Sequence, residues 1–250
     1  MMQFLTLLIL GVIVFLIMRR ILKNQAEKKI REQIDSYYEP QGEFKESESM
    51  DEPLNFGYKN MWFAVKADTN EEIANLLDLD ILGKANWVNG MEESYNKRVF
   101  ITPQVKGWKL ICGWGLSKLV EGESADVKIL NNLSAKYGEA HYFFNHRVNE
   151  CHIWAKSENG ELQRYYGWVG DIGENIKIEG DPTEIEKDLN LVNTFLPEAE
   201  NEEAYFNDES LVIPHEDLVM EIAANWSVSP MDLYKTEDAD NDFGIVAVMR

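Results

Sequence analysis

Residues 140–169, which read AHYFFNHRVNECHIWAKSENGELQRYYGWV, decide the fold. Three stretches of this segment, 140–145, 150–156 and 162–169, are rich in aromatic and β-branched residues, and short polar segments separate them. This composition predicts three β-strands. The second and third are expected to form an antiparallel hairpin, because the Asn159-Gly160 pair between them is the strongest two-residue turn signal.

Further strands are predicted on both sides of this segment. They are residues 61–66 (MWFAVK), 98–102 (RVFIT), 108–114 (WKLICGW), 176–179 and 243–249 (FGIVAVM). Most are short, apolar and bounded by Gly, Pro or Asp, which is typical of strands in an antiparallel sheet.

Helical signals are fewer. A first helix is expected to follow Asp68-Thr69-Asn70, and a second to begin at the capping residue Ser124 and end at Gly138. A third is expected from Thr183, and the last over residues 214–226, where Leu218, Ile222 and Trp226 recur at i, i+4 spacing. The sequence therefore predicts an α+β domain with a mostly antiparallel sheet and three to four helices, over residues 54–250.

The chain begins with an uncharged segment, residues 1–18 (MMQFLTLLILGVIVFLIM). As a helix this segment spans about 27 Å, close to the hydrocarbon thickness of a bilayer, so we predict a single transmembrane helix. A cleaved signal peptide would carry its basic residues before the apolar run rather than after it. The anchor residues are Phe4, Leu5, Leu7, Leu8, Ile9, Leu10, Val12, Ile13, Val14, Phe15, Leu16, Ile17, Arg19 and Arg20.

The basic residues after the anchor predict its orientation. Residues 1–33 contain six Lys and Arg against two Glu, and all six follow the apolar run. Under the positive-inside rule, the C-terminal domain is then cytoplasmic. Residues 19–34 are expected to continue the helix as a basic stalk. Residues 35–53, which are acidic and contain two Pro, are expected to form a flexible linker.

The composition excludes several classes of function. The 250 residues include 24 Lys and Arg against 44 Asp and Glu, a net charge of −20. Nucleic acid is therefore not expected as a ligand, because phosphate binding requires clustered cations. Two Cys exclude a disulfide scaffold.

No motif specifies a catalytic, metal or cofactor site. His141, His146, Cys151 and His152 lie within twelve residues, but strand alternation divides them between two faces. Cys112 lies in an apolar strand of an acidic protein, a setting that disfavours a nucleophilic thiolate. We therefore predict no cofactor, no metal and no enzymatic activity.

A surface for binding another protein is the feature that the sequence favours. Strands expose alternate residues, so part of the aromatic content is expected to form an exposed, charge-ringed face. An acidic loop over residues 197–209 adds a second element. The candidate partner-binding residues are Trp108, Trp114, Tyr142, Trp154, Tyr166, Trp168, Glu198, Glu200, Glu202 and Glu203.

Two stretches resemble a known family: KYGEAHYFFNHRVNECHIWAKSENGELQRYYGWVG, within residues 133–182, and PHEDLVMEIAANWSVSP. The pattern is similar to a family of bacterial proteins of unknown activity that includes candidate immunity proteins of interbacterial toxin systems. The resemblance covers about half of the chain, contains no catalytic motif and assigns no site residue.

The resemblance implies an immunity protein that occludes a cognate toxin, and the acidity of the domain favours a basic toxin. The predicted anchor is a departure from the family and would place the protein in the inner membrane. Two alternatives remain: a membrane-tethered hydrolase of unknown substrate, and a scaffold of an envelope assembly.

Overall fold

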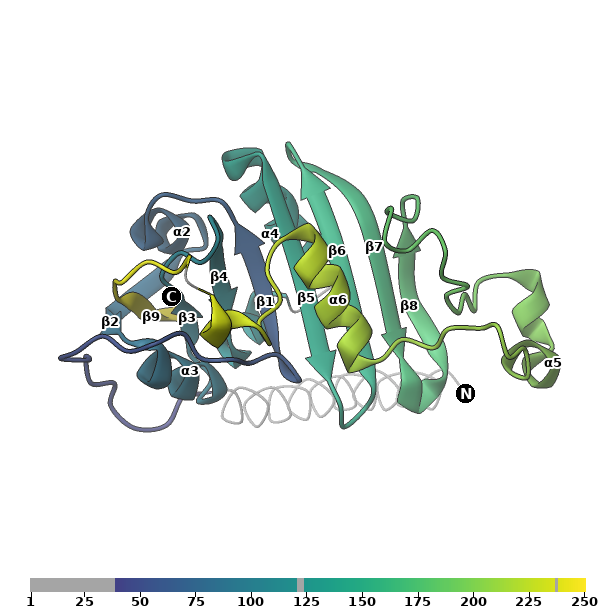
Figure 1. Cartoon of the computed structure of the whole chain (residues 1–250), viewed down its shortest axis with the longest axis horizontal. Coiled ribbons are helices and arrows are strands. Elements are labelled where there is room, and N and C mark those ends of the chain that lie inside the picture. Colours follow the sequence, from purple (N-terminus) through teal and green to yellow (C-terminus); the bar gives the residue numbers. More distant parts are fainter. Residues whose placement is uncertain (1–38, 121–123, 237) are drawn as a thin grey trace, which may run out of the picture. The chain divides into compact units, whose positions relative to one another are not determined.

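The computed structural model describes residues 39–120, 124–236 and 238–250. Nine strands in these residues form one antiparallel sheet in the order β2-β9-β3-β4-β1-β5-β6-β7-β8 (Figure 1). The strands are β1 Lys59–Val65, β2 Leu79–Ala85, β3 Val99–Ile101, β4 Lys109–Cys112, β5 Glu139–His146, β6 Cys151–Glu158, β7 Glu161–Val169, β8 Glu174–Glu179 and β9 Gly244–Met249. The α-helices are α2 Asn70–Leu76, α3 Trp87–Tyr95, α4 Ala125–Tyr137, α5 Glu202–Phe206 and α6 Glu216–Trp226. The predicted α+β class with an antiparallel sheet is confirmed.

The predicted membrane anchor (residues 1–18) and basic stalk (residues 19–34) lie outside the described residues. Within the described part of the chain, no helix combines the length and the apolar character that crossing a bilayer requires. The anchor therefore stays a prediction from the sequence.

The predicted hairpin joins β6 and β7. Asn159 and Gly160 form its turn with φ of 51° and 88°, the positive values that a tight hairpin turn requires. The turn also binds α4, because Gly160 N donates to Ser134 Oγ at 2.9 Å. The hairpin signal in the sequence is therefore confirmed, and the helix before the hairpin holds its turn in place.

Helices α2 and α4 cover one side of the sheet, which we call the α4 face. Met61, Phe63 and Val65 of β1 pack there with Leu130 and Leu133 of α4. The α4 helix ends at Gly138, as predicted, where φ is 84°. Its N-cap differs from the prediction: Ser124 adopts a left-handed conformation and its side chain makes no capping hydrogen bond.

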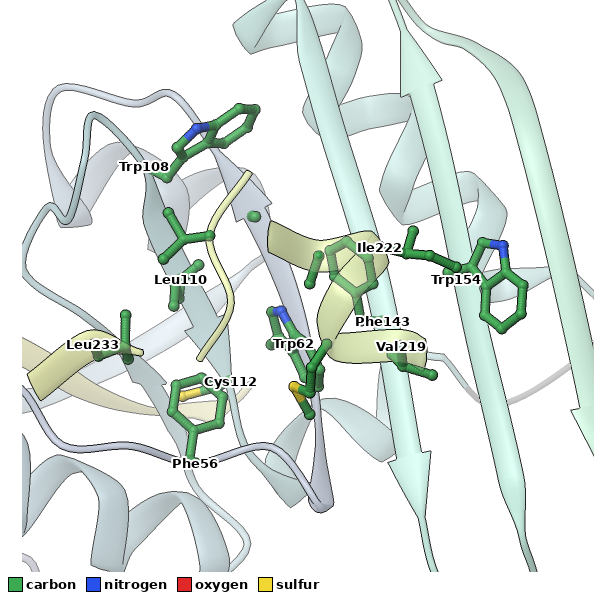
Figure 2. Close-up of a cluster of buried hydrophobic side chains, with 14 of the residues drawn as sticks. Phe56, Trp62, Trp108, Leu110, Cys112, Phe143, Trp154, Val219, Ile222 and Leu233 are labelled. Atoms are coloured by element: carbon green, nitrogen blue, oxygen red, sulfur yellow. The ribbon is translucent and has the colours of Figure 1, made fainter. Parts of the chain in front are cut away.

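The opposite side, which we call the α6 face, contains the larger aromatic cluster (Figure 2). Trp62 and Phe143 stack at a centroid distance of 5.2 Å, and Val219 and Ile222 of α6 pack over them. In Figure 1, α6 lies across β5 and β6. Both sides of the central strands are consequently buried, so apolar side chains follow one another along much of their length, as in residues 61–65 of β1.

Three elements were not predicted from the sequence: β2, α3 and the short helix α5, which forms within the expected acidic loop. The edge strand β2 is mostly exposed and irregular, with a shift in register between Ile81 and Gly83. The helix α3 contains Gly90, and glycine is a poor helix former. The position requires glycine because a Cβ there would lie 2.2 Å from the ring of Phe100.

One predicted helix does not form. Residues 184–188 are turns, and the chain makes a single helical turn in which Lys187 N donates to Thr183 O at 3.1 Å. The Glu186 side chain turns back onto Thr183 and into the sheet. The segment is thus held by one buried side chain, and it does not continue as a helix.

The predicted flexible linker is part of the domain over its described residues. Ser47 N donates to the edge strand β2 at Lys84 O, at 3.1 Å. Asp51 accepts hydrogen bonds from the first two amides of α3, Trp87 N at 2.6 Å and Val88 N at 3.0 Å. The compact unit consequently extends over Pro40–Arg250 and does not begin at residue 54.

We predict that Asp51→Ala lowers the free energy of unfolding of a fragment of residues 40–250 by about 1 kcal/mol, because two amides at the α3 N-terminus lose a charged acceptor. Urea denaturation measures this difference. Glu52→Ala is the matched control, since the neighbouring carboxylate makes no such contact, and its effect is expected within about 0.5 kcal/mol. Equal effects of the two substitutions would contradict a capping role for Asp51.

Candidate protein-binding edge

The structure does not expose the aromatic residues that we expected at a binding surface. Five of the six are buried: Trp108, Tyr142, Trp154, Tyr166 and Trp168. The expected exposed aromatic face is therefore wrong for these five residues. The reason is that helices and loops cover both sides of the sheet, so alternate residues enter one core or the other. Trp114 is half-buried against Phe144, at a centroid distance of 5.9 Å.

The acidic residues gather at the opposite end of the sheet from β2. Residues 171–213 contain 13 Asp and Glu against two Lys. Both lysines are already paired: Lys177 with Glu179 at 2.9 Å, and Lys187 with Glu184. Ten of the carboxylates are exposed, namely Asp171, Glu174, Glu179, Asp181, Glu184, Asp188, Glu198, Glu200, Asp208 and Glu209. We call residues 171–213 the acidic edge.

Two of the four predicted acidic residues can be placed. Glu198 and Glu200 are exposed in a short 3-10 helix over Pro197–Glu200. Glu202 and Glu203 lie in α5, and their side chains are not among those described. In Figure 1 the chain runs out beyond β8 to α5 before it returns to α6. The acidic loop of the sequence therefore belongs to this edge.

Large apolar side chains are exposed on the same edge. Ile172 and Phe195 are each 60% exposed, Ile176 is 47% exposed and Leu196 is 44% exposed. Thr194 and Asn175 hold these segments together: Asn175 N donates to Thr194 Oγ1, and Thr194 N donates to Asn175 Oδ1, both at 2.9 Å. Ile176 lies in a predicted strand, whereas no strand or helix period in the sequence marks Ile172, Phe195 or Leu196.

One buried carboxylate fastens the acidic edge to the sheet. Glu186 Oε1 accepts from Arg164 Nε at 2.9 Å, Arg164 Nη2 at 2.8 Å and Trp154 Nε1 at 2.9 Å. Its other oxygen accepts from Thr183. Burial raises the pKa of Glu186, but the hydrogen bonds from Arg164 and Thr183 outweigh burial and hold the pKa below its usual value. Tyr166 adds a bond from its hydroxyl to Val192 O.

A cavity of about 420 Å³ lies beside the acidic edge, between the β5–β6 turn and the start of α6. We call it the α6 cavity. It is lined by Arg147, Glu150, His152, Ile213, Pro214, His215, Glu216 and Asp217. His152 is 3% exposed, and its Nδ1 lies 2.8 Å from Asn145 Oδ1. Burial, together with the nearby His215, lowers the pKa of His152 to about 4, so this side chain is neutral at pH 7.

Ion pairs and hydrogen bonds fix the rim of the α6 cavity. Arg147 binds Glu216 through two bonds, from Nε at 2.7 Å and from Nη2 at 3.0 Å. The Tyr58 hydroxyl donates to Asp217 at 3.0 Å, and the Arg147 guanidinium lies 4.9 Å from the centre of the Tyr58 ring. His215 Nδ1 caps α6 by accepting from Leu218 N at 3.3 Å. The first turn of α6 is thus attached to the β5–β6 turn.

The four candidate metal ligands do not converge. Cys151 belongs to the cluster on the α4 face, while the buried His141 lies 5.5 Å from Trp226, between ring centroids, on the α6 face. Among the residues that the structure describes, no group of three His, Cys, Asp or Glu side chains could hold a metal ion. Burial raises the pKa of the Cys112 thiol, and it raises that of Cys151 to about 12. Neither thiol is prepared as a nucleophile.

We predict that Glu186→Gln lowers the free energy of unfolding of the 40–250 fragment by about 3–5 kcal/mol, because Arg164 then stays buried without a counter-charge. Glu184→Gln is the matched control, since it breaks an exposed pair and is expected to cost less than about 1 kcal/mol. Urea denaturation measures both variants. A loss below about 1 kcal/mol for Glu186→Gln would show that the edge does not depend on this carboxylate.

The stability of the fragment is also predicted to depend on pH through His152. Its pKa is 6.5 when unfolded and about 4 when folded, so the unfolded state binds more protons between these values. Stability is therefore full above pH 6.5 and falls as the pH drops toward 4, by about 2 kcal/mol at pH 5. His152→Asn keeps a donor for Asn145 without titrating, and is expected to flatten the stability profile over this range. An unchanged profile would assign the pH dependence to other groups.

Comparison of the chain with models of protein families, with curated proteins and with solved structures finds no match. Any function must therefore be argued from the edge, the cavity and the charge of the domain.

Proposed function

We propose that this protein is a membrane-tethered, immunity-type protein that binds a basic antibacterial toxin and neutralises it by stoichiometric occlusion. The observation that carries the proposal is the acidic edge, where large exposed apolar side chains, among them Ile172, Phe195 and Leu196, lie among ten exposed carboxylates. Apolar anchors inside a charged rim are the composition of a protein-binding surface.

The charge of the domain supports a basic partner. Residues 40–250 contain 18 Lys and Arg against 40 Asp and Glu, a net charge of −22. A second copy of this chain would bring the same charge to the interface and would be repelled. A cationic toxin would instead be attracted, which speeds encounter and selects the partner.

The proposed mechanism is binding without catalysis. Each partner covers the other, so inhibition is expected to reach completion at one molecule of this protein for each toxin. The sequence adds a location to the proposal, with the anchor in a bacterial inner membrane and the domain in the cytoplasm. A tether at the membrane would suit a toxin that is met as it enters the cell.

We predict that the full-length chain, in detergent, binds the toxin encoded by a neighbouring gene, with an association rate that falls about tenfold between low and physiological salt. Charge reversal at Glu198 and Glu200 is also expected to lower the association rate. Stopped-flow measurements at several salt concentrations test both expectations. An association rate independent of salt would remove the electrostatic part of the proposal.

Leu196→Ala is expected to raise the dissociation rate of the same complex by about 30-fold, which corresponds to about 2 kcal/mol, because an anchor is lost from the buried interface. Leu82→Ala is the matched control: Leu82 is 40% exposed, close to the 44% of Leu196, but lies in β2 at the opposite edge of the sheet. Equal effects of the two substitutions would exclude the acidic edge as the binding surface.

A further inference from the structure

We infer that the α6 cavity is a receptor for one guanidinium group, supplied by an arginine side chain of the partner protein. The cavity has about 420 Å³ of space, and its lining includes the imidazole of His152, three carboxylates and the apolar residues Ile213 and Pro214. This inference rests on the proposed function in one respect, namely that the arginine belongs to a bound protein.

The hydrogen bonds of Asn145 determine which nitrogen of the His152 imidazole carries the proton. Asn145 Nδ2 donates to Glu216 O at 3.4 Å, so its Oδ1 is the atom that faces His152. His152 must then carry its proton on Nδ1, which leaves a lone pair on Nε2. No hydrogen bond joins this Nε2 to any residue that the structure describes. A side chain that is 3% exposed therefore presents an unused acceptor in the cavity lining.

The rim supplies negative charge that Arg147 does not neutralise completely. Arg147 is the one Lys or Arg among the lining residues, and it is already bound to Glu216. Glu150 and Asp217 add two further carboxylates. Gly170, which has no side chain, leaves room for the Glu150 carboxylate, because a Cβ at this position would lie 2.3 Å from Glu150 Oε2. An incoming cation thus meets an excess of acceptors.

A guanidinium fits this set of groups better than a compact ammonium. It has five N–H donors in a plane, which can reach Nε2 of His152 and a carboxylate together. Its weakly hydrated faces can pack on Ile213 and Pro214, which line the same cavity.

The position of the cavity connects it to the acidic edge. Gly170 N donates to Glu150 O at 3.0 Å, and Asp171 N lies 3.4 Å from Asn149 O. The β5–β6 turn that lines the cavity is therefore bonded to the segment where the acidic edge begins. A protein that covers the edge is placed to insert a side chain into the cavity.

The four histidines of the chain make a direct test possible. In the full-length protein in detergent, with ¹⁵N-labelled histidine, titration with N-acetyl-arginine amide is expected to shift the His152 and His215 imidazole signals. His141 and His146 lie outside the cavity and serve as internal controls. N-acetyl-citrulline amide, which has nearly the same shape without the charge, is expected to bind at least tenfold more weakly.

Variants locate the effect without disturbing the core. Glu150→Gln removes an exposed carboxylate from the cavity lining. This substitution is expected to lower the affinity for N-acetyl-arginine amide by about threefold to tenfold. Glu198→Gln, on the acidic edge but outside the cavity, is expected to leave the affinity unchanged.

The inference would be overturned by equal shifts with the citrulline amide, by equal affinity for N-acetyl-lysine amide, by shifts at all four histidines, or by no shift. Tighter binding of free L-arginine than of its amide would indicate a free amino acid as the ligand, and would also overturn it.

The experiments distinguish failure of the inference from failure of the proposed function. Toxin binding without any shift by the arginine amide would reject the receptor and retain the acidic edge. Binding of the amide by a chain that binds no neighbouring toxin would retain the receptor and reject the immunity role.

Discussion

A nine-stranded sheet presents two apolar faces to water, and the need to cover both determines where the other elements of this domain lie. Helices α2 and α4 cover one side, while α3, α6 and the chain between β8 and β9 cover the other. Alternation along β1 shows the consequence at single residues, since Trp62 enters one core and Phe63 the other. The buried aromatic residues of the strands therefore form the core, and the recognition that we propose falls to the edge of the sheet.

The same requirement explains how much of the fold could be predicted. The central strands were predictable because burial on both sides gives them runs of apolar residues, such as residues 61–65 of β1. The edge strand β2 was not, because exposure permits Asp80 and a glycine within it. The helix α3 was not predicted because it contains Gly90, which is required there by the close approach of the Phe100 ring. The helix expected from Thr183 is absent, and the segment is held instead by the buried Glu186, which pairs with Arg164, 22 residues earlier in the chain. Local sequence periodicity cannot indicate a partner at that separation.

The candidate site, like the fold, was predictable only in part. Acidity is a property of composition, so the presence of a negative loop could be predicted from residues 197–209. Its apolar anchors could not, because Phe195 and Leu196 become neighbours of β8 through hydrogen bonds between Thr194 and Asn175, 19 residues apart. The α6 cavity likewise assembles His152 and Asp217 from distant positions. Long-range contacts of this kind leave no periodic signal in one sequence.

The acidic edge and the α6 cavity divide the proposed recognition between two physical effects. Exposed carboxylates act at a distance of about 8–10 Å through solvent and are screened by salt, so they govern how quickly a basic partner arrives. Groups inside a cavity act after water has left, at short range and with fixed geometry, so they govern how long the partner stays. The buried pair of Glu186 and Arg164 fastens the edge to the same sheet from which His152 projects. Because both parts are attached to one sheet, a partner of the proposed kind that is guided by the edge would meet the cavity in a fixed orientation. The proposed specificity would then follow from the requirement that one arginine and one basic apolar surface fit at the same time.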